Sequence, residues 1–181
     1  EKVLSDSIDS IARQTAYMNK LVENLLFLAR SDGKRQALLR TPFSVKELFD
    51  EMIEEQILLD EAHSYTAACD PSLILSADRN MVKQLLHAVI DNSVKYTPPG
   101  GHIRLCAAAR AGEIALSVSD TGIGMDAEHL VHIFERFYRA DKARARATGG
   151  MGLGLSIAAA IAFAHNGRIT AQSEPNKGTT I

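Results

Sequence analysis

The run Gly149-Gly150-Met151-Gly152-Leu153-Gly154-Leu155 opens the most apolar segment of the chain, Leu153 to Ala164. That segment is shorter than the roughly 20 residues that cross a bilayer, and we interpret it as a buried helix. Glycine costs about 1 kcal/mol per helical position relative to alanine, so alternate glycines at a helix start need a reason. Bare N–H groups at a helix N-terminus bind anions without needing side-chain clearance. The run therefore predicts a phosphate site.

Two common phosphate-binding folds do not fit this run. It lacks the Gly-Lys-Ser or Gly-Lys-Thr ending of the Walker loop. No βαβ unit surrounds it, as the dinucleotide fingerprint requires. A flexible linker would also be glycine-rich, but the apolar residues between these glycines argue against one. A different nucleotide-binding fold is expected.

Upstream, Asp120-Thr121-Gly122-Ile123-Gly124 follows directly on an apolar strand. A carboxylate at a strand end can accept from an exocyclic amine, and two glycines let the backbone pass close to a flat ligand. An ordinary Asp-x-Gly turn is the alternative interpretation of this motif.

Further upstream, Asp91-Asn92-Ser93-Val94-Lys95-Tyr96 ends a predicted helix. Asn92 offers a neutral oxygen to a hard cation such as Mg²⁺, which keeps waters and bridges phosphates. Lys95 lies three residues on, on the same side, where it can neutralise phosphate charge. A merely polar helix end is the alternative.

The connection from Asp126 to Gly149 is strongly basic, and it contains Phe134-Glu135-Arg136-Phe137-Tyr138-Arg139. Connections this long without clear structure are usually lids or disordered. Between two candidate ligand-binding motifs, we favour a basic lid over a solvated surface loop. The basic residues are Arg136, Arg139, Lys142, Arg144 and Arg146.

Helices and strands are segregated along the remaining sequence. A capping box at Ser44 predicts a helix to about Ala62, and Asp78 is the expected cap of a second helix that reaches Tyr96. The first helix should turn Leu48, Met52, Ile53, Ile57 and Leu59 inward. Strands are expected at 38–43, 64–69, 72–76, 103–106, 114–118 and 168–173, with another from Gly178 and a helix at 153–165. This order predicts an α+β fold with helices on one mixed sheet.

The first 32 residues carry a heptad pattern that Asp32-Gly33 ends. We favour a helix of an intermolecular bundle over an amphipathic helix packed on its own domain. The seam is formed by Leu4, Ile8, Ile11, Thr15, Met18, Val22, Leu25 and Ala29.

Composition excludes several classes. The net charge of −2 provides no basic field for nucleic acid. The two cysteines, Cys69 and Cys106, have no metal-ligand spacing and suit a reducing compartment. The chain opens in the middle of a helix pattern, so we expect it to be part of a longer protein.

In this order the motifs resemble the catalytic domain of sensor histidine kinases, within the gyrase, chaperone and mismatch-repair ATPase superfamily. The stretch 91–96 is similar to the N box, 120–124 to the G1 box, 134–138 to the F box and 150–155 to the G2 box. Gly178-Thr179-Thr180 resembles the final glycine motif.

The resemblance implies a Bergerat-type two-layer α/β sandwich that holds ATP and Mg²⁺ beneath a mobile lid. Asp120 would bind the adenine amino group, and Asn92 the metal. Lys95 and the G2 backbone would hold phosphates, and Arg139 is a candidate partner of the γ-phosphate. The implied catalytic residues are Asn92, Lys95 and Arg139, and the implied cofactor-binding residues are Asn92, Lys95, Tyr96, Asp120, Gly122, Gly124, Gly150, Gly152, Leu153, Gly154, Leu155 and Thr179.

By the same resemblance, residues 1–32 are the second helix of a dimerisation and phosphoacceptor domain, and 38–181 are the ATP-binding catalytic domain. The protein would be a homodimer through its N-terminal helix and would phosphorylate a response regulator. It would be the cytoplasmic portion of a membrane-anchored bacterial kinase. None of the six histidines has the phosphoacceptor context, so the accepting histidine is expected upstream of Glu1.

One position departs from the pattern. Ala88, four residues before Asn92, stands where related kinases commonly carry Asn and hydrolytic relatives a Glu that activates water. Alanine cannot accept a proton, which argues against a conformational ATPase of the gyrase or chaperone type. An ATP-sensing pseudokinase module stays open as a further alternative.

Overall fold

The computed structural model describes residues 7, 11, 14–15, 18–19, 21–22, 24–28, 38–110, 112–140 and 151–181. The chain divides into two units, Glu1–Gln36 and Ala37–Ile181. Every described residue of the first unit is helical. No described helix has the length and apolar character to span a membrane.

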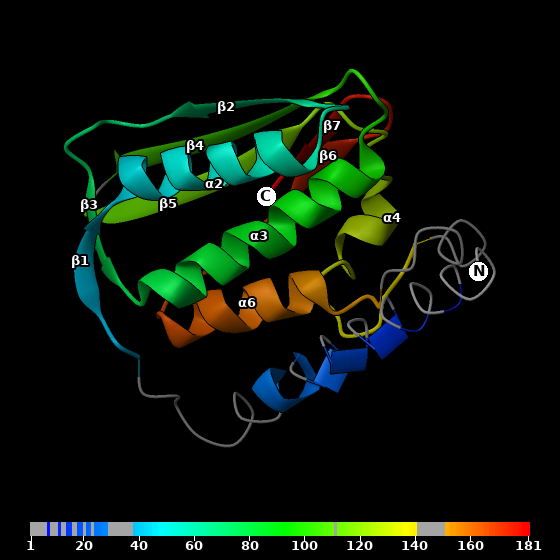
Figure 1. Ribbon diagram of the computed structural model, residues 1–181, viewed down its shortest axis with the longest axis horizontal. Helices are drawn as coiled ribbons and strands as arrows, with labels where there is room; N and C mark the ends of the chain where they lie inside the picture. The colour runs from blue at the N-terminus through cyan, green and yellow to red at the C-terminus, as the bar shows by residue number, and fades with distance from the viewer. Residues whose placement is uncertain are drawn as a thin grey trace. The chain divides into compact units, whose positions relative to one another are not determined.

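The larger unit is a two-layer sandwich of helices on a sheet (Figure 1). Five strands form a sheet in the order β2-β4-β5-β7-β6, in which β2 is parallel to β4 and the other pairs are antiparallel. Strands β1 and β3 form a separate antiparallel pair. The elements are β1 (Thr41–Ser44), α2 (Val45–Leu59), β2 (Ser64–Ala68), β3 (Ile74–Ala77), α3 (Arg79–Tyr96), β4 (His102–Arg110), β5 (Glu113–Asp120), α4 (Ala127–Leu130), α6 (Gly154–Ala164), β6 (Gln172–Glu174) and β7 (Gly178–Thr180).

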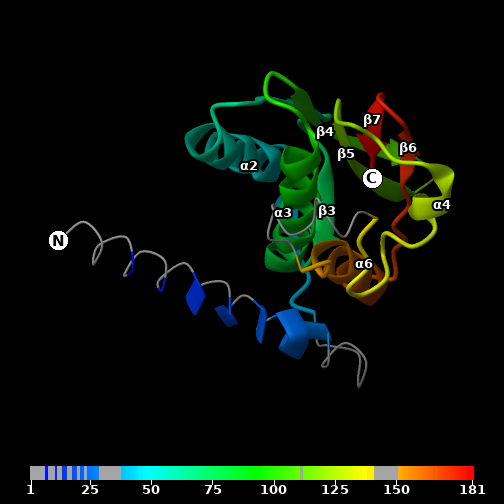
Figure 2. The same ribbon diagram turned by 90° about the vertical axis from the view of Figure 1, so that its right-hand side faces the viewer.

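Helices α2, α3 and α6 lie on the same side of the five-stranded sheet, with α6 packed along α3 (Figure 2). The core fills the space between these layers. Phe49 of α2, Ile90 of α3 and Leu105 of β4 are fully buried in it. The α+β prediction with a mixed sheet is confirmed.

Both predicted helix caps are present. The Ser44 hydroxyl accepts from the backbone N–H of Glu47 at 3.3 Å, and the Asp78 carboxylate accepts from that of Met81 at 3.2 Å. A second oxygen of Asp78 accepts from the Leu39 N–H at 3.1 Å, so the cap of α3 also holds the chain before β1.

Two local predictions were wrong. Helix α2 ends at Leu59 instead of about Ala62, and Ile57 and Leu59 are 56% and 79% exposed instead of inward. The buried stripe of α2 ends with Met52 and Gln56, and the residues of the helix after Gln56 are exposed. The strand expected at 168–173 is replaced by the shorter β6, Gln172–Glu174, whose partner β7 has three residues.

Candidate functional site

The register of the central hairpin determines where Asp120 points. Asp120 pairs with Ile103, and Val118 pairs with Leu105 in the same register. Paired residues share one face of a sheet, and Ile103, Leu105 and Val118 are all buried beneath the helices. Asp120 therefore ends β5 with its side chain on the helix-covered face.

Three donors hold the Asp120 carboxylate in one orientation. Its Oδ1 accepts from the backbone N–H groups of Gly122 at 2.9 Å and Thr179 at 3.1 Å. Its Oδ2 accepts from the Ser93 hydroxyl of α3 at 3.0 Å. The predicted residues Asp120, Gly122 and Thr179 are thus in direct contact.

Gly122 makes a close approach to the end of α3. A Cβ at this position would lie 2.6 Å from the Tyr96 carbonyl oxygen and 3.0 Å from the Thr97 hydroxyl oxygen. The sequence suggested that this glycine clears space for a ligand. In the structure the protein's own backbone occupies that space, and the Ile123 N–H donates to the Tyr96 carbonyl at 3.1 Å.

The loop after β5 is also tied to the last two strands. The Met125 N–H donates to the Ser173 hydroxyl at 2.9 Å, and Asn176 donates to the Ile123 carbonyl at 2.6 Å. Ser173 also donates to the Gly178 carbonyl at 2.9 Å. Gly124, a predicted binding residue, lies in this loop.

Helix α3 contributes Asn92, Lys95 and Tyr96 from its last two turns. All three are half-buried. The Lys95 ammonium lies 5.0 Å from the centroid of the Tyr96 ring, a cation–π contact. Within the described residues no cluster of three His, Cys, Asp or Glu side chains could hold a metal ion. A cation at Asn92 would therefore need oxygens from phosphate and water, which suits Mg²⁺.

The start of α6 presents backbone and not side chains. Leu153, at the N-cap, is buried and caps no N–H with its side chain, and Leu155 packs against the core. A Cβ on Gly154 would lie 3.9 Å from the Cβ of Ala88, so this helix start faces α3. The first N–H groups of a helix lack carbonyl partners within the helix, and such a position can bind anions.

The basic connection is described only in part. Gly149, Gly150 and the rest of the predicted lid at 141–150 lie outside the described residues. Before residues 141–150, Arg139 is half-buried. After these residues, the Gly152 carbonyl accepts from the Phe137 N–H at 2.9 Å.

Sequence reasoning missed Ser93 and Thr97. Ser93 lies within the 91–96 motif, and a small polar residue on the buried face of a helix is a signal for a hydrogen-bond partner in the sheet. Thr97 is the C-cap of α3, and its buried hydroxyl has no hydrogen-bond partner among the described residues.

The family of histidine kinase-, DNA gyrase B- and HSP90-like ATPases matches residues 77–181. The sensor histidine kinase YkoH of Bacillus subtilis is 40% identical over 99% of this chain, which spans 39% of YkoH. WalK of the same organism, also a sensor histidine kinase, is 36% identical over 93% of this chain, which spans 28% of WalK. The structure of full-length ShkA in complex with AMPPNP is 26% identical and superimposes with a TM-score of 0.80, covering 93% of this chain and 35% of ShkA.

Proposed function

Because the chain belongs to the family of histidine kinase-, DNA gyrase B- and HSP90-like ATPases, we propose that it is the ATP-binding catalytic part of a sensor histidine kinase. The observation that supports this proposal most directly is the fixed Asp120 carboxylate. Hydrogen bonds from Ser93, Gly122 and Thr179 hold it in one orientation. A fixed acceptor of this kind selects a ligand that presents an N–H at one place, as the adenine amino group does.

The phosphates would lie along the start of α6. The N–H groups at Gly154 and Leu155 supply donors, and the positive end of the helix favours anions. Lys95 would leave the Tyr96 ring to neutralise phosphate charge. The predicted residues Gly150 and Gly152 would contribute backbone donors to the same group, and Leu153 would contribute through its main chain only.

The amide oxygen of Asn92 is the proposed protein ligand of Mg²⁺. A Mg²⁺ ion held there would supply positive charge that offsets the negative charge of the phosphates. Arg139 is the proposed partner of the γ-phosphate when the basic connection covers the site. The attacking imidazole would belong to the dimerisation domain, and the catalytic domain would contribute positioning and charge neutralisation.

Transfer to histidine is favoured over hydrolysis because of Ala88. This residue lies on α3 opposite Gly154, where a water-activating carboxylate would otherwise face the start of α6. Its methyl group cannot accept a proton. The gyrase-type ATPase is therefore not favoured.

The first 32 residues would be one helix of the dimerisation domain. Four described seam residues, Ile11, Met18, Val22 and Leu25, are each at least 41% exposed in the single chain. An apolar seam left uncovered is what a bundle with a second copy would bury. The full protein would then be a homodimer that passes phosphate to a response regulator, with this part in the cytoplasm of a membrane-anchored kinase.

The test mixes this chain with a polypeptide carrying the full dimerisation domain, radiolabelled ATP and Mg²⁺. Acid-labile label on the histidine of the added domain supports the proposal. Release of inorganic phosphate alone would indicate a hydrolytic ATPase instead, and binding without turnover would indicate a nucleotide-sensing pseudokinase. Substitution of the accepting histidine by alanine in the added domain is the control.

A further inference from the structure

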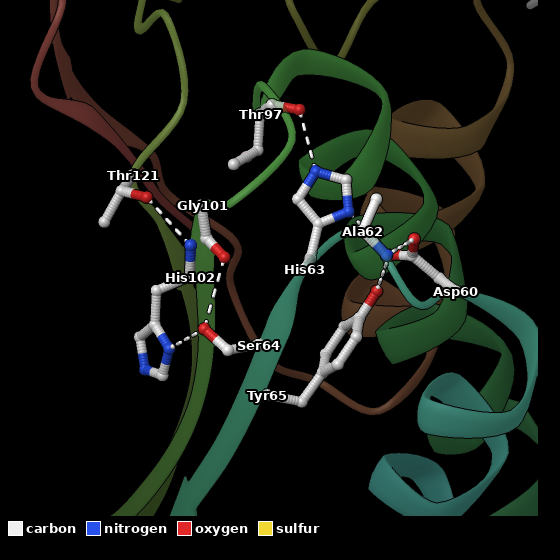
Figure 3. Close-up of polar contacts among 9 residues, drawn as sticks. All are labelled: Asp60, Ala62, His63, Ser64, Tyr65, Thr97, Gly101, His102 and Thr121. Carbon is white, nitrogen blue, oxygen red and sulfur yellow. Dashed lines mark hydrogen bonds and ion pairs between the residues drawn. The ribbon is translucent and has the colours of Figure 1, made fainter.

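His63 lies between the end of α2 and the start of β2, with only 6% of its side chain exposed. Its Nδ1 is 2.6 Å from Oδ2 of Asp60, the C-cap of α2. Its Nε2 is 2.9 Å from the carbonyl oxygen of Thr97, the C-cap of α3. Figure 3 shows the ring bridging these two partners.

Both partners of His63 are acceptors. A neutral imidazole carries one N–H and can satisfy only one of them, whereas an imidazolium donates to both. His165 provides the contrast within the same fold, because its Nε2 accepts from the Asp78 N–H at 3.1 Å while Nδ1 faces the Ile161 carbonyl at 2.8 Å. His165 thus has a donor facing one ring nitrogen and an acceptor facing the other, whereas the two acceptors around His63 define His63 as a cation.

The surroundings agree with this assignment. Burial opposes the charge on His63, but the Thr97 carbonyl and the Asp60 carboxylate together raise the pKa of His63 above its ordinary value. Asp60 also accepts from the Ala62 N–H at 3.0 Å and from the Tyr65 hydroxyl. Despite burial, which raises it, the pKa of Asp60 is lowered by the hydrogen bonds from Tyr65 and His63. Asp60 and Tyr65 are the titratable groups that contact this ring or its carboxylate among the described residues.

The Thr97 carbonyl belongs to the turn that supports the candidate adenine site. On one side of this turn, the Tyr96 carbonyl accepts from Ile123, and Gly122 lies against the Tyr96 and Thr97 oxygens. On the other side, the Gly100 N–H donates to the Ala62 carbonyl at 2.7 Å, and the Ser64 N–H donates to the Gly101 carbonyl at 3.0 Å. The turn after α3 is therefore held between the His63 segment and the loop that orients Asp120.

We propose that His63 is a positioning residue of the nucleotide site, which as a buried imidazolium fixes the turn after α3 against which the Gly122–Ile123 segment packs. A cation at the C-terminus of α3 is also favoured by the helix dipole. Loss of the proton removes one of the two bonds and frees the turn to move. The inference rests on the proposed function, since it takes ATP as the ligand.

Fluorescent-ATP titrations between pH 6 and 10 test the proposal with wild type, His63→Gln and Asp60→Asn. We expect His63→Gln to bind about tenfold more weakly at pH 6, the effect of losing a charge-assisted bond that holds a site. The ratio of the wild-type affinity to the His63→Gln affinity should fall as the pH rises, because His63 of the wild type then loses its proton. In Asp60→Asn, the loss of ATP affinity with rising pH should occur at lower pH than in wild type, since the carboxylate that holds the His63 proton is gone.

His102→Gln is the matched control. Among the described residues, the His102 ring has hydrogen bonds with the hydroxyls of Ser64 and Thr66, at 2.9 Å each. The His102→Gln variant should bind fluorescent ATP as wild type does at every pH. Thermal unfolding of each variant establishes that it is folded. Wild-type affinity in His63→Gln, or a profile that Asp60→Asn does not move, overturns the inference alone. Failure of wild type to bind at every pH overturns the proposed function as well.

Discussion

The backbone N–H of Phe137 donates to the carbonyl of Gly152 at 2.9 Å, and both residues have left-handed backbone angles, with φ of 64° and 69°. Phe137 adopts this conformation although the residue is 59% exposed. The bond joins the chain before residues 141–150 to the chain that opens α6. Phe137, in the first part of the basic connection, is thus joined to the residues that open the candidate phosphate site.

Gly152→Ala should destabilise the fold by about 2–4 kcal/mol. The left-handed angle costs an alanine about 1–2 kcal/mol, and overpacking adds to it, because the new Cβ would lie 2.8 Å from the Tyr138 carbonyl oxygen. Urea unfolding measures the loss. Gly112→Ala is the matched control, since Gly112 has φ of 82° and nothing within 4 Å of a Cβ. Equal losses in the two variants would show that the Tyr138 contact is unimportant.

Asp120→Asn should reduce ATP affinity by about 100-fold or more and leave stability nearly unchanged. The asparagine oxygen can still accept from Gly122 and Thr179, while its amide can donate to Ser93, so the protein contacts survive. Toward the ligand, however, the asparagine amide N–H would face the amino group of adenine, so two donors would oppose each other. Calorimetric titration with ATP measures the affinity. Asp126→Asn, at an exposed position with no capping bond, should bind as wild type does, and unchanged affinity in Asp120→Asn would refute the adenine assignment.

ATP with Mg²⁺ should protect residues 140–149 from trypsin, which has Lys142, Arg144 and Arg146 as cleavage sites there. Contact of basic residues with phosphate would remove them from the protease. Mass spectrometry of timed digests identifies the cuts. Asp120→Asn with ATP should be cut as fast as the free protein. Equal cleavage of wild type with and without nucleotide would argue against a lid.

The ion pairs between α2 and α3 should make stability depend on acid pH. Hydrogen bonds from Lys83 and then Arg79 lower the pKa of Glu51 from 4.5 to about 2. A depressed pKa contributes stability that is complete above pH 4.5 and is lost as the pH falls toward 2. Because Glu51 is 37% exposed, solvent limits the contribution to below about 1 kcal/mol.

Urea unfolding at pH 7 and pH 3 checks this dependence. Glu51→Gln should be less stable than wild type at pH 7, and the difference should shrink at pH 3. Glu113→Gln removes the pair with Arg168, in which both side chains are more than two-thirds exposed, and should change little at either pH. A constant Glu51→Gln difference would contradict the assignment.

The helix starts and the central hairpin could be predicted from the sequence because the contacts that form them are local. The caps at Ser44 and Asp78 and the β4–β5 hairpin depend on residues a few positions apart. The predicted inward positions Ile57 and Leu59 were wrong for a non-local reason, since packing against other elements decides which part of a helix is covered.

In the candidate site, too, residues within local motifs could be predicted, whereas contacts between distant residues could not. Asp120 and Thr179 were identified from motifs, but the Ser93 hydroxyl contacts Asp120 from 27 residues away. His63 and Thr97 are 34 residues apart. These pairs depend on the sheet register and on where two helices end, which no spacing along the chain encodes.

The three hydrogen bonds to Asp120 would also limit which base the proposed nucleotide site can bind. A carboxylate offers about four lone-pair positions, and Gly122, Thr179 and Ser93 fill three of them. The lone-pair position that these described donors leave can accept a hydrogen bond but cannot donate one. Guanine presents a carbonyl oxygen where adenine presents an amine, so two acceptors would oppose each other. If Asp120 accepts from adenine as proposed, the same carboxylate would exclude guanine nucleotides by repulsion, with no further side chain needed to discriminate.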